Sequence, residues 1–119
     1  MKKHLSDELQ NVKKKIPKDE VIYDLAELFK IFGDSTRTKI LSCLSITKLN
    51  VSEIAEILDM NISAVSHQLR ILRSAKLIKG EKTGKEVTYS LDDNHVMLIM
   101  ECGLSHIEEK WGINYGKVI

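Results

Sequence analysis

Residues 50–75, NVSEIAEILDMNISAVSHQLRILRSA, decide the fold. Apolar residues recur at spacings of three and four on both sides of Asp59-Met60-Asn61, which predicts two amphipathic helices joined by a tight turn. Two helices connected in this way are typical of a helix-turn-helix. The residues expected to be buried are Val51, Ile54, Ala55 and Leu58 in the first helix and Ile62, Val65, Leu69 and Leu72 in the second.

Two further helices are predicted upstream of this pair. A helical pattern begins at Asp19 and ends at Gly33, and Asp34 is a good N-cap for the helix that follows. Asn50 with Glu53 three residues later is the pattern of a capping box at the start of the helix-turn-helix. In the helix after Asp34, the residues expected to be buried are Ile40, Leu41 and Leu44.

Downstream of the pair, the apolar pattern changes from that of a helix to that of strands. Residues 77–82 and 86–91 flank Thr83-Gly84-Lys85, which predicts a β-hairpin with glycine at its tip. Asp92-Asp93-Asn94 then supplies caps for a last helix from about His95 to Trp111. We therefore expect a mainly α-helical domain with a small β-hairpin.

The second helix of the pair and the hairpin carry side chains suited to DNA. Residues 61–90 hold six basic and two acidic residues in a chain whose net charge is only +1, which favours a surface that faces a polyanion. Serine and glutamine bond base edges or phosphates, arginine binds guanine through two hydrogen bonds, and lysines bind the phosphate backbone. The residues predicted to contact DNA are Ser63, Ser66, His67, Gln68, Arg70 and Arg73 on the helix and Lys82 and Lys85 on the hairpin.

Four segments of the chain together carry a family pattern. They are LFKIFGDSTR at 28–37 with Lys39-Ile40-Leu41, AVSHQLRIL at 64–72, Gly84 with Tyr89-Ser90-Leu91, and DDNHV at 92–96. In this order, across about residues 20–110, they resemble the winged-helix repressors of the ArsR/SmtB type. The resemblance implies a winged helix-turn-helix whose dimer binds double-stranded operator DNA, blocks transcription and loses DNA affinity when an inducer binds.

The last helix carries candidate metal ligands at both ends. Asp93 and His95 stand at its start, and His106 and Glu109 stand near its end. The eleven-residue separation of the two histidines corresponds to about 16 Å of helix, so one helix cannot bring both ends to one ion. The same separation returns to nearly the same face, within about 20°. If two copies of the helix pack antiparallel, the pair at the start of one meets the pair at the end of the other. This arrangement gives two symmetric sites with two nitrogen and two carboxylate ligands, which suit Zn(II) or a similar divalent ion.

The resemblance points to the same four residues. Zinc-sensing members of the family carry Asp-x-His at the start of the last helix and His-x-x-(His or Glu) eleven residues after the first histidine. Asp93-Asn94-His95 and residues 106–109 match this pattern, which implies Zn(II), or else Co(II) or Cd(II), as the effector. The family's other metal site uses cysteines, typically Cys-x-Cys, where this chain has Leu49-Asn50-Val51-Ser52, so a thiolate site is not expected there.

Two alternative regulatory schemes remain open. Some relatives pair a cysteine in the second core helix with one in the last helix, so Cys43 and Cys102 are candidates for a thiol or sulfide sensor, although Cys43 is offset by one residue from that position. As plain structural residues, both cysteines are expected to be buried or half-buried. The chain could also bind DNA without any metal response. An enzyme is not expected, because four protein ligands leave no open position on a zinc ion.

The expected domain organisation has three parts. A basic N-terminal arm or accessory helix occupies 1–18, the winged helix-turn-helix domain with a C-terminal dimerisation helix occupies 19–111, and a tail occupies 112–119. A chain of 119 residues is at the small end for a self-sufficient core, so oligomerisation is expected. Together with the dimer that the resemblance implies, this predicts a homodimer formed through the N- and C-terminal helices. No apolar run approaches a membrane span of about 20 residues, and the N-terminus lacks the apolar stretch of a signal peptide. We therefore expect a cytoplasmic protein without a membrane partner.

Overall fold

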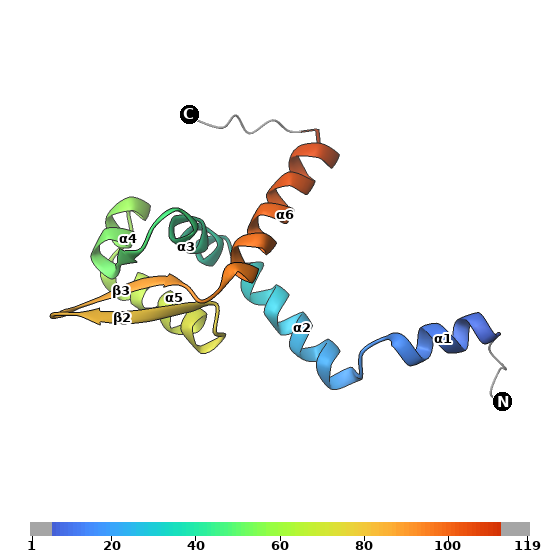
Figure 1. The fold of residues 1–119 in the computed structure, drawn as a ribbon. Helices are drawn as coiled ribbons and strands as arrows, with labels where there is room; N and C mark the ends of the chain where they lie inside the picture. The colour runs from blue at the N-terminus through green and yellow to red at the C-terminus, as the bar shows by residue number, and fades with distance from the viewer. Residues whose placement is uncertain (1–5, 113–119) are drawn as a thin grey trace. The chain divides into compact units, whose positions relative to one another are not determined.

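The computed structural model describes residues 6–112 and confirms a winged helix-turn-helix (Figure 1). The chain divides into two compact units, one that ends at Ile31 and one that begins at Phe32. The elements, in chain order, are α1 (Asp7–Lys15), α2 (Asp19–Phe32), α3 (Ser35–Ile46), β1 (Leu49–Asn50), α4 (Val51–Leu58), α5 (Ile62–Ser74), β2 (Ile78–Thr83), β3 (Glu86–Leu91) and α6 (Asn94–Lys110). The expected boundaries of the arm, the domain and the tail remain predictions, and residues 113–119 of the tail lie outside the described range.

The first unit consists of α1 and nearly all of α2. Ser6 caps α1 by accepting a hydrogen bond from the backbone N–H of Leu9 at 3.3 Å. Neither helix has a fully buried side chain. The apolar residues Leu9, Val12 and Ile16 lie on one stripe of the N-terminal segment and are largely exposed. Uncovered stripes of this kind are typical of helices that pack against another surface.

The core of the second unit lies between α3, α4, α5 and the sheet. Full burial of a Val, Leu or Ile side chain contributes about 1.5–3 kcal/mol, so these contacts dominate the stability of the unit. The predicted burial is confirmed for all three residues of α3, for two of the four in α4 and for three of the four in α5. The buried apolar residues are Ile40, Leu41, Leu44, Leu49, Ile54, Ala55, Val65, Leu69, Leu72, Leu77, Ile78 and Val96.

Three residues of the predicted buried set differ from the expectation. Val51 and Leu58 are only half-buried, and Ile62 is 52% exposed. Ile62 is the first residue of α5 and follows the turn at residues 59–61, which is itself mostly exposed. The helical period places Ile62 on the apolar stripe, but the stripe extends past the edge of the core at this end.

Side-chain caps set the starts of α3, α4 and α5, and the sequence predicts those at Asp34 and Asn50. The carboxylate of Asp34 accepts from Arg37 N at 3.0 Å and begins α3. Asn50 and Glu53 form the full capping box. The Asn50 side chain accepts from the backbone N–H of Glu53 at 2.8 Å, and the Glu53 side chain accepts from the backbone N–H of Asn50 at 2.9 Å. Asn61 accepts from the backbone N–H of the third residue of α5 at 2.8 Å. Each such cap satisfies a backbone donor that the helix itself leaves unpaired.

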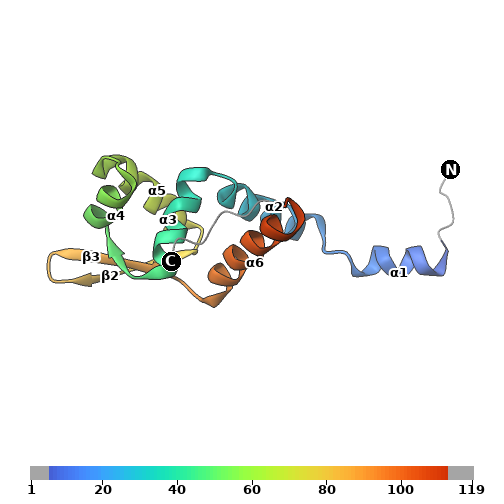
Figure 2. The ribbon, with the colours of Figure 1, turned by 90° about the horizontal axis from the view of Figure 1, so that it is seen from above.

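The wing is the hairpin of β2 and β3, and it belongs to a three-stranded antiparallel sheet in the order β1-β3-β2. Gly84 turns the hairpin with φ +65°, a conformation that costs glycine little. β1 was not predicted because two residues are too short to show a strand period; its Leu49 pairs with Tyr89 of β3. The hairpin tip extends away from the helices of the second unit (Figures 1 and 2).

Replacing Lys76 with glycine should stabilise the protein. Lys76 connects α5 to β2 with φ +60°, and a left-handed conformation costs an L-residue about 1–2 kcal/mol. Because glycine is also more flexible in the unfolded chain, we expect a net gain of about 0.5–1 kcal/mol. Thermal unfolding followed by circular dichroism should show a melting temperature a few degrees higher. Lys79→Gly, in the extended backbone of β2, should instead lower it.

Candidate functional site

The polar side of α5 is open to solvent along its first three turns. Ser63, His67 and Arg70 are exposed, and Ser66 is half-buried. The opposite side of the helix is held in the core by Val65, Leu69 and Leu72. The side chains predicted to contact DNA therefore lie on a helix whose rotation about its own axis is fixed by burial. Their contacts with DNA remain predictions.

Gln68 has a structural partner that the sequence did not reveal. Its side-chain oxygen accepts a hydrogen bond from Arg37 Nη1 at 3.3 Å, across 31 residues of chain. Both side chains are half-buried, so the bond lies where competition from water is reduced. Arg37 belongs to the first turn of α3, and the bond links that turn to the middle of α5. No local sequence signal could have found this pair, because it forms only in the folded unit.

Arg73 lies beside the base of the wing. A methyl group added to Gly80 would lie 3.4 Å from Arg73 Nη1 and 2.8 Å from Val87 Cγ1. Glycine at this point of β2 therefore allows the strand to pass close to both side chains. Arg73 is exposed, and its guanidinium is situated where α5 meets the hairpin.

The wing carries exposed cations near its tip and is attached to the start of α4. Lys82 and Lys85 are exposed on either side of Gly84. Below the tip, Asn50 Nδ2 donates to Glu86 Oε2 at 3.1 Å. Because Asn50 also caps α4, the same residue fixes the helix start and one strand of the wing. This bond was not predicted, because its partners are 36 residues apart.

Asp93 and His95 form a contact at the start of α6. Asp93 is the N-cap and accepts from the backbone N–H of His95 at 2.8 Å, while His95 Nδ1 lies 3.3 Å from its other carboxylate oxygen. The hydrogen bond from the His95 side chain lowers the pKa of Asp93, and the nearby backbone N–H groups add to this effect. Both side chains remain accessible, with 85% of His95 and 49% of Asp93 exposed. A carboxylate on one imidazole nitrogen is also the arrangement that orients many metal-binding histidines.

His106 and Glu109 lie near the other end of α6. Both are exposed, as is His95. The helix is continuous from Asn94 to Lys110, so the structure brings Asp93 and His95 together but leaves His106 about 16 Å and Glu109 about 21 Å further along the helix. Within residues 6–112, no three His, Cys, Asp or Glu side chains are gathered closely enough to hold a metal ion. The four candidate ligands remain predictions.

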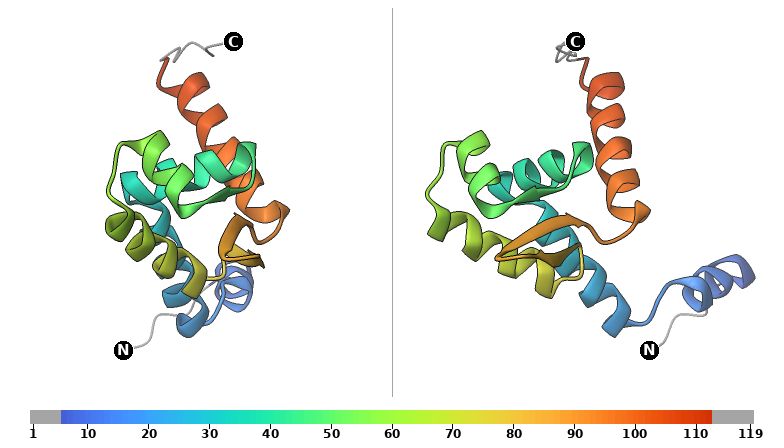
Figure 3. Two further views of the ribbon diagram at one scale, coloured as in Figure 1. Left: turned by 90° about the vertical axis from the view of Figure 1, so that its left-hand side faces the viewer. Right: turned by 60° about the vertical axis from the view of Figure 1, so that its left-hand side comes forward.

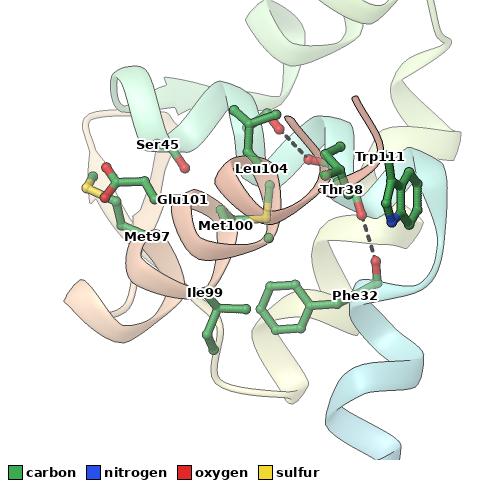
Figure 4. Close-up of a pocket in the computed structure, with 12 residues that line it drawn as sticks. Phe32, Thr38, Ser45, Met97, Ile99, Met100, Glu101, Leu104 and Trp111 are labelled. Atoms are coloured by element: carbon green, nitrogen blue, oxygen red, sulfur yellow. Dashed lines mark hydrogen bonds between the residues drawn. The ribbon is translucent and has the colours of Figure 1, made fainter. Parts of the chain in front are cut away.

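An apolar cavity of about 770 Å³ lies between α3 and α6 (Figure 4). Val96 is the one fully buried side chain of α6, and Ile99 and Leu104 are 37% and 48% exposed. The C-terminal half of α6 projects away from α4 and α5 (Figures 1 and 3). The residues that line the cavity are Phe32, Thr38, Ser42, Ser45, Met97, Ile99, Met100, Glu101, Gly103, Leu104, Ile107 and Trp111.

The two cysteines lie in different environments. Cys43 is half-buried in α3, as expected, and burial raises the pKa of its thiol. Cys102 is exposed on α6, contrary to the expectation that it would be buried or half-buried. Cys102 lies in a helix in which only Val96 is fully buried, so the packing of the second unit does not cover it.

The sequence can be compared with known proteins at this point. The family model described as bacterial regulatory protein, arsR family, matches residues 34–79. A protein of Synechocystis sp. named transcriptional repressor SmtB homolog is 36% identical over 103 residues, which cover 87% of this chain and 78% of that protein. This chain belongs to the arsR family. The expected family is therefore confirmed.

Two further similarities support the assignment to the arsR family. The cadmium resistance transcriptional regulatory protein CadC homolog of Staphylococcus aureus is 38% identical over 104 residues, covering 87% of this chain and 85% of that protein. The solution structure of apo-NmtR matches with a TM-score of 0.70 and 33% identity, covering 87% of this chain and 85% of that one. Both of the named relatives are transcriptional regulators rather than enzymes, as expected. Of the helices in residues 6–112, none combines the length and the hydropathy that a membrane span requires.

Removing the His95 side chain should raise the pKa of Asp93. The imidazole supplies the largest contribution that lowers this pKa, so His95→Ala should shift it upward toward the ordinary value for aspartate. The backbone N–H bond to the cap remains, so part of the lowering should persist. Carboxyl carbon chemical shifts in an NMR pH titration measure the change. His106→Ala, at the far end of α6, should leave the Asp93 titration unchanged.

Proposed function

We propose that this arsR-family protein is a DNA-binding transcriptional repressor that releases its operator when a divalent metal ion binds between two copies of α6. Zn(II) is the favoured effector, with Co(II) and Cd(II) as similar candidates. The observation that carries the proposal is that α6 presents two exposed pairs of candidate ligands, Asp93 with His95 and His106 with Glu109, at its opposite ends. Each pair is incomplete on one chain and becomes a four-ligand set when two copies meet.

Support for DNA binding comes from the arrangement of α5 and the wing. α5 exposes serine, histidine and arginine side chains on the side away from the core, and the wing carries Lys82 and Lys85 at its tip. In helix-turn-helix proteins the second helix enters the major groove, and cations beside it bind phosphates. The proposed DNA contacts are Ser63, Ser66, His67, Gln68, Arg70, Arg73, Lys82 and Lys85.

Support for metal binding comes from the chemistry of the four side chains. Two imidazoles and two carboxylates match the ligand types and number that a closed tetrahedral zinc site uses. The two side chains of one pair, Asp93 and His95, are in contact, with His95 Nδ1 3.3 Å from the carboxylate. Among the relatives, the Staphylococcus aureus protein is named for cadmium resistance. The bound ion would cross-link the two copies, while the chain's own residues position its ligands.

Support for a homodimer comes from the uncovered apolar surface. Leu98, Ile99 and Leu104 on α6 are substantially exposed, and a cavity opens between this helix and α3 (Figure 4). Exposed apolar faces of this kind mark association surfaces, and a second copy would cover them. Antiparallel packing of the two α6 helices would also bring each incomplete ligand pair next to its complement.

The proposed regulation is a coupling between two sites. Metal between the α6 helices would favour a dimer geometry whose α5 helices fit the operator poorly. Such coupling is reciprocal, so operator DNA must weaken metal binding by the same factor. Metal affinity should also fall as the pH decreases, because both imidazoles bind metal only when unprotonated.

Zinc should weaken operator binding by the wild type but not by His106→Ala. Loss of one imidazole leaves each shared site with three ligands, and we expect the zinc-dependent loss of DNA affinity, at least tenfold for the wild type, to disappear. Fluorescence anisotropy with the upstream promoter DNA, with and without added Zn(II), measures both proteins. Without added zinc, the wild type and His106→Ala should bind the promoter DNA with equal affinity.

Variants of the two cysteines serve as the matched control. Cys43→Ser and Cys102→Ser should retain the zinc response, because neither thiol belongs to the proposed ligand set. If zinc leaves the wild-type DNA affinity unchanged, the metal-sensing proposal is wrong. If the response instead requires both thiols, the thiol-based alternative replaces it.

Alanine at Lys82 or Lys85 should reduce the salt dependence of DNA binding. A protein that neutralises a phosphate releases counterions, with a slope of about −0.9 per contact in a plot of log K against log salt. A dimer carries each wing lysine twice, so each variant should lower the magnitude of the slope by about 2. Titrations at four or more salt concentrations measure it. Lys110→Ala, on the last turn of α6, should leave the slope unchanged, and an unaltered slope for both wing variants would contradict the role of the wing.

A further inference from the structure

Ile62 is the large apolar side chain of α5 that the fold does not bury. It is 52% exposed, whereas Val65, Leu69 and Leu72 on the same stripe are almost completely covered. The core therefore gains little from an isoleucine at this position. Ser66, four residues further along and one of the proposed DNA contacts, lies on the same face of the helix as Ile62, so Ile62 borders the polar side of α5.

The first turn of α5 is the part of the helix that can come nearest to base edges. Recognition helices of helix-turn-helix proteins contact bases mainly through their N-terminal residues. The side-chain oxygen of Asn61 caps this turn by accepting a hydrogen bond from the backbone N–H of Ala64 at 2.8 Å. Ser63, in the same turn, is exposed. Further along, the Arg37–Gln68 hydrogen bond ties the same helix to α3. Ile62 is thus held at the leading end of a helix fixed by its own core and by a side-chain bond.

The chemistry of the major groove allows one apolar partner for such a side chain. All four bases present hydrogen-bonding groups there, but only thymine also presents a methyl group, at C5. An isoleucine cannot satisfy a donor or acceptor, so over a G·C pair it would remove polar base edges from water without compensation. Contact with the methyl group removes apolar surface of both partners from water.

We propose that Ile62 contacts the C5-methyl group of a thymine in each operator half-site and so selects thymine at that position. The inference rests on the proposed function, because it requires α5 to be the DNA-reading helix. It adds a specificity-determining residue to the polar contacts already proposed. It also accounts for an exposed isoleucine on the apolar stripe of that helix.

The test compares loss of the methyl group on the DNA with loss of the side chain on the protein. A duplex is first selected from a random-sequence pool with the full-length wild-type protein, and each thymine of its half-sites is then replaced by uracil, which lacks only the C5-methyl group. Anisotropy titrations give the affinities of the wild type, Ile62→Val and Ile62→Ala for each duplex. One uracil position per half-site should weaken wild-type binding by about fivefold.

The expected signature is coupling between the two changes. Ile62→Ala should lose about fivefold on the thymine duplex and show no further loss with uracil at the same position, while Ile62→Val should lie between. Ile57→Ala is the matched control, since Ile57 on α4 is 57% exposed and should retain the full uracil effect. Circular dichroism should show unchanged folding for all three variants.

Two results would overturn the inference. If every uracil substitution affects Ile62→Ala as much as the wild type, the side chain and the methyl group do not interact. The same conclusion follows if Ile62→Ala binds the thymine duplex as tightly as the wild type. In either case the DNA-binding proposal survives, because the selected duplex is still bound. If the wild type selects no duplex at all, the proposed function fails and this inference fails with it.

Discussion

The arrangement of the second unit depends on the burial of one side of α5. Leu69 and Leu72 are almost completely buried with Ile40 of α3 and Ile54 of α4 in a single core. Each such side chain contributes about 1.5–3 kcal/mol, which is large compared with a typical net stability of about 5–15 kcal/mol for a domain. Rotating α5 about its axis would expose this stripe, so the core determines which residues of the helix face solvent. The functional surface is therefore a consequence of packing on the opposite side.

Two hydrogen bonds between side chains connect the surface elements to the helices of the core. Arg37 holds Gln68 and connects the start of α3 to α5, and Asn50 holds Glu86 and connects the start of α4 to the wing. Each bond involves a residue at or near a helix start, where capping has already fixed the backbone. The proposed joint contact of α5 and the wing with DNA would benefit from such connections, because ordering the protein before binding lowers the entropic cost of association.

α6 differs from the other helices of the second unit because its neighbours cover little of it. Val96 anchors its first turn in the core, but most of the helix keeps apolar and ionisable side chains accessible. The two pairs of candidate ligands are separated along one rigid element. A helix of this kind gives one chain two incomplete sites, and this is the property on which the proposed dependence on a second copy rests. The exposed apolar side chains of α6 would be unfavourable in a monomer, and a second copy packed against the helix would cover them.

Local features of this protein were determined by the sequence itself. The caps at Asp34, Asn50 and Asp93, the glycine turn of the wing and the buried stripe of α5 follow from residue chemistry and helical period, and the structure contains all of them. These features involve residues within a few positions of one another, where the rules of backbone geometry apply directly. The tertiary structure alone decided the bonds that join distant segments, the third strand at Leu49–Asn50 and the exposure of Ile62 and Cys102. A periodic pattern identifies the side of a helix that is apolar, but only the packed neighbours determine how far along the helix that side is covered.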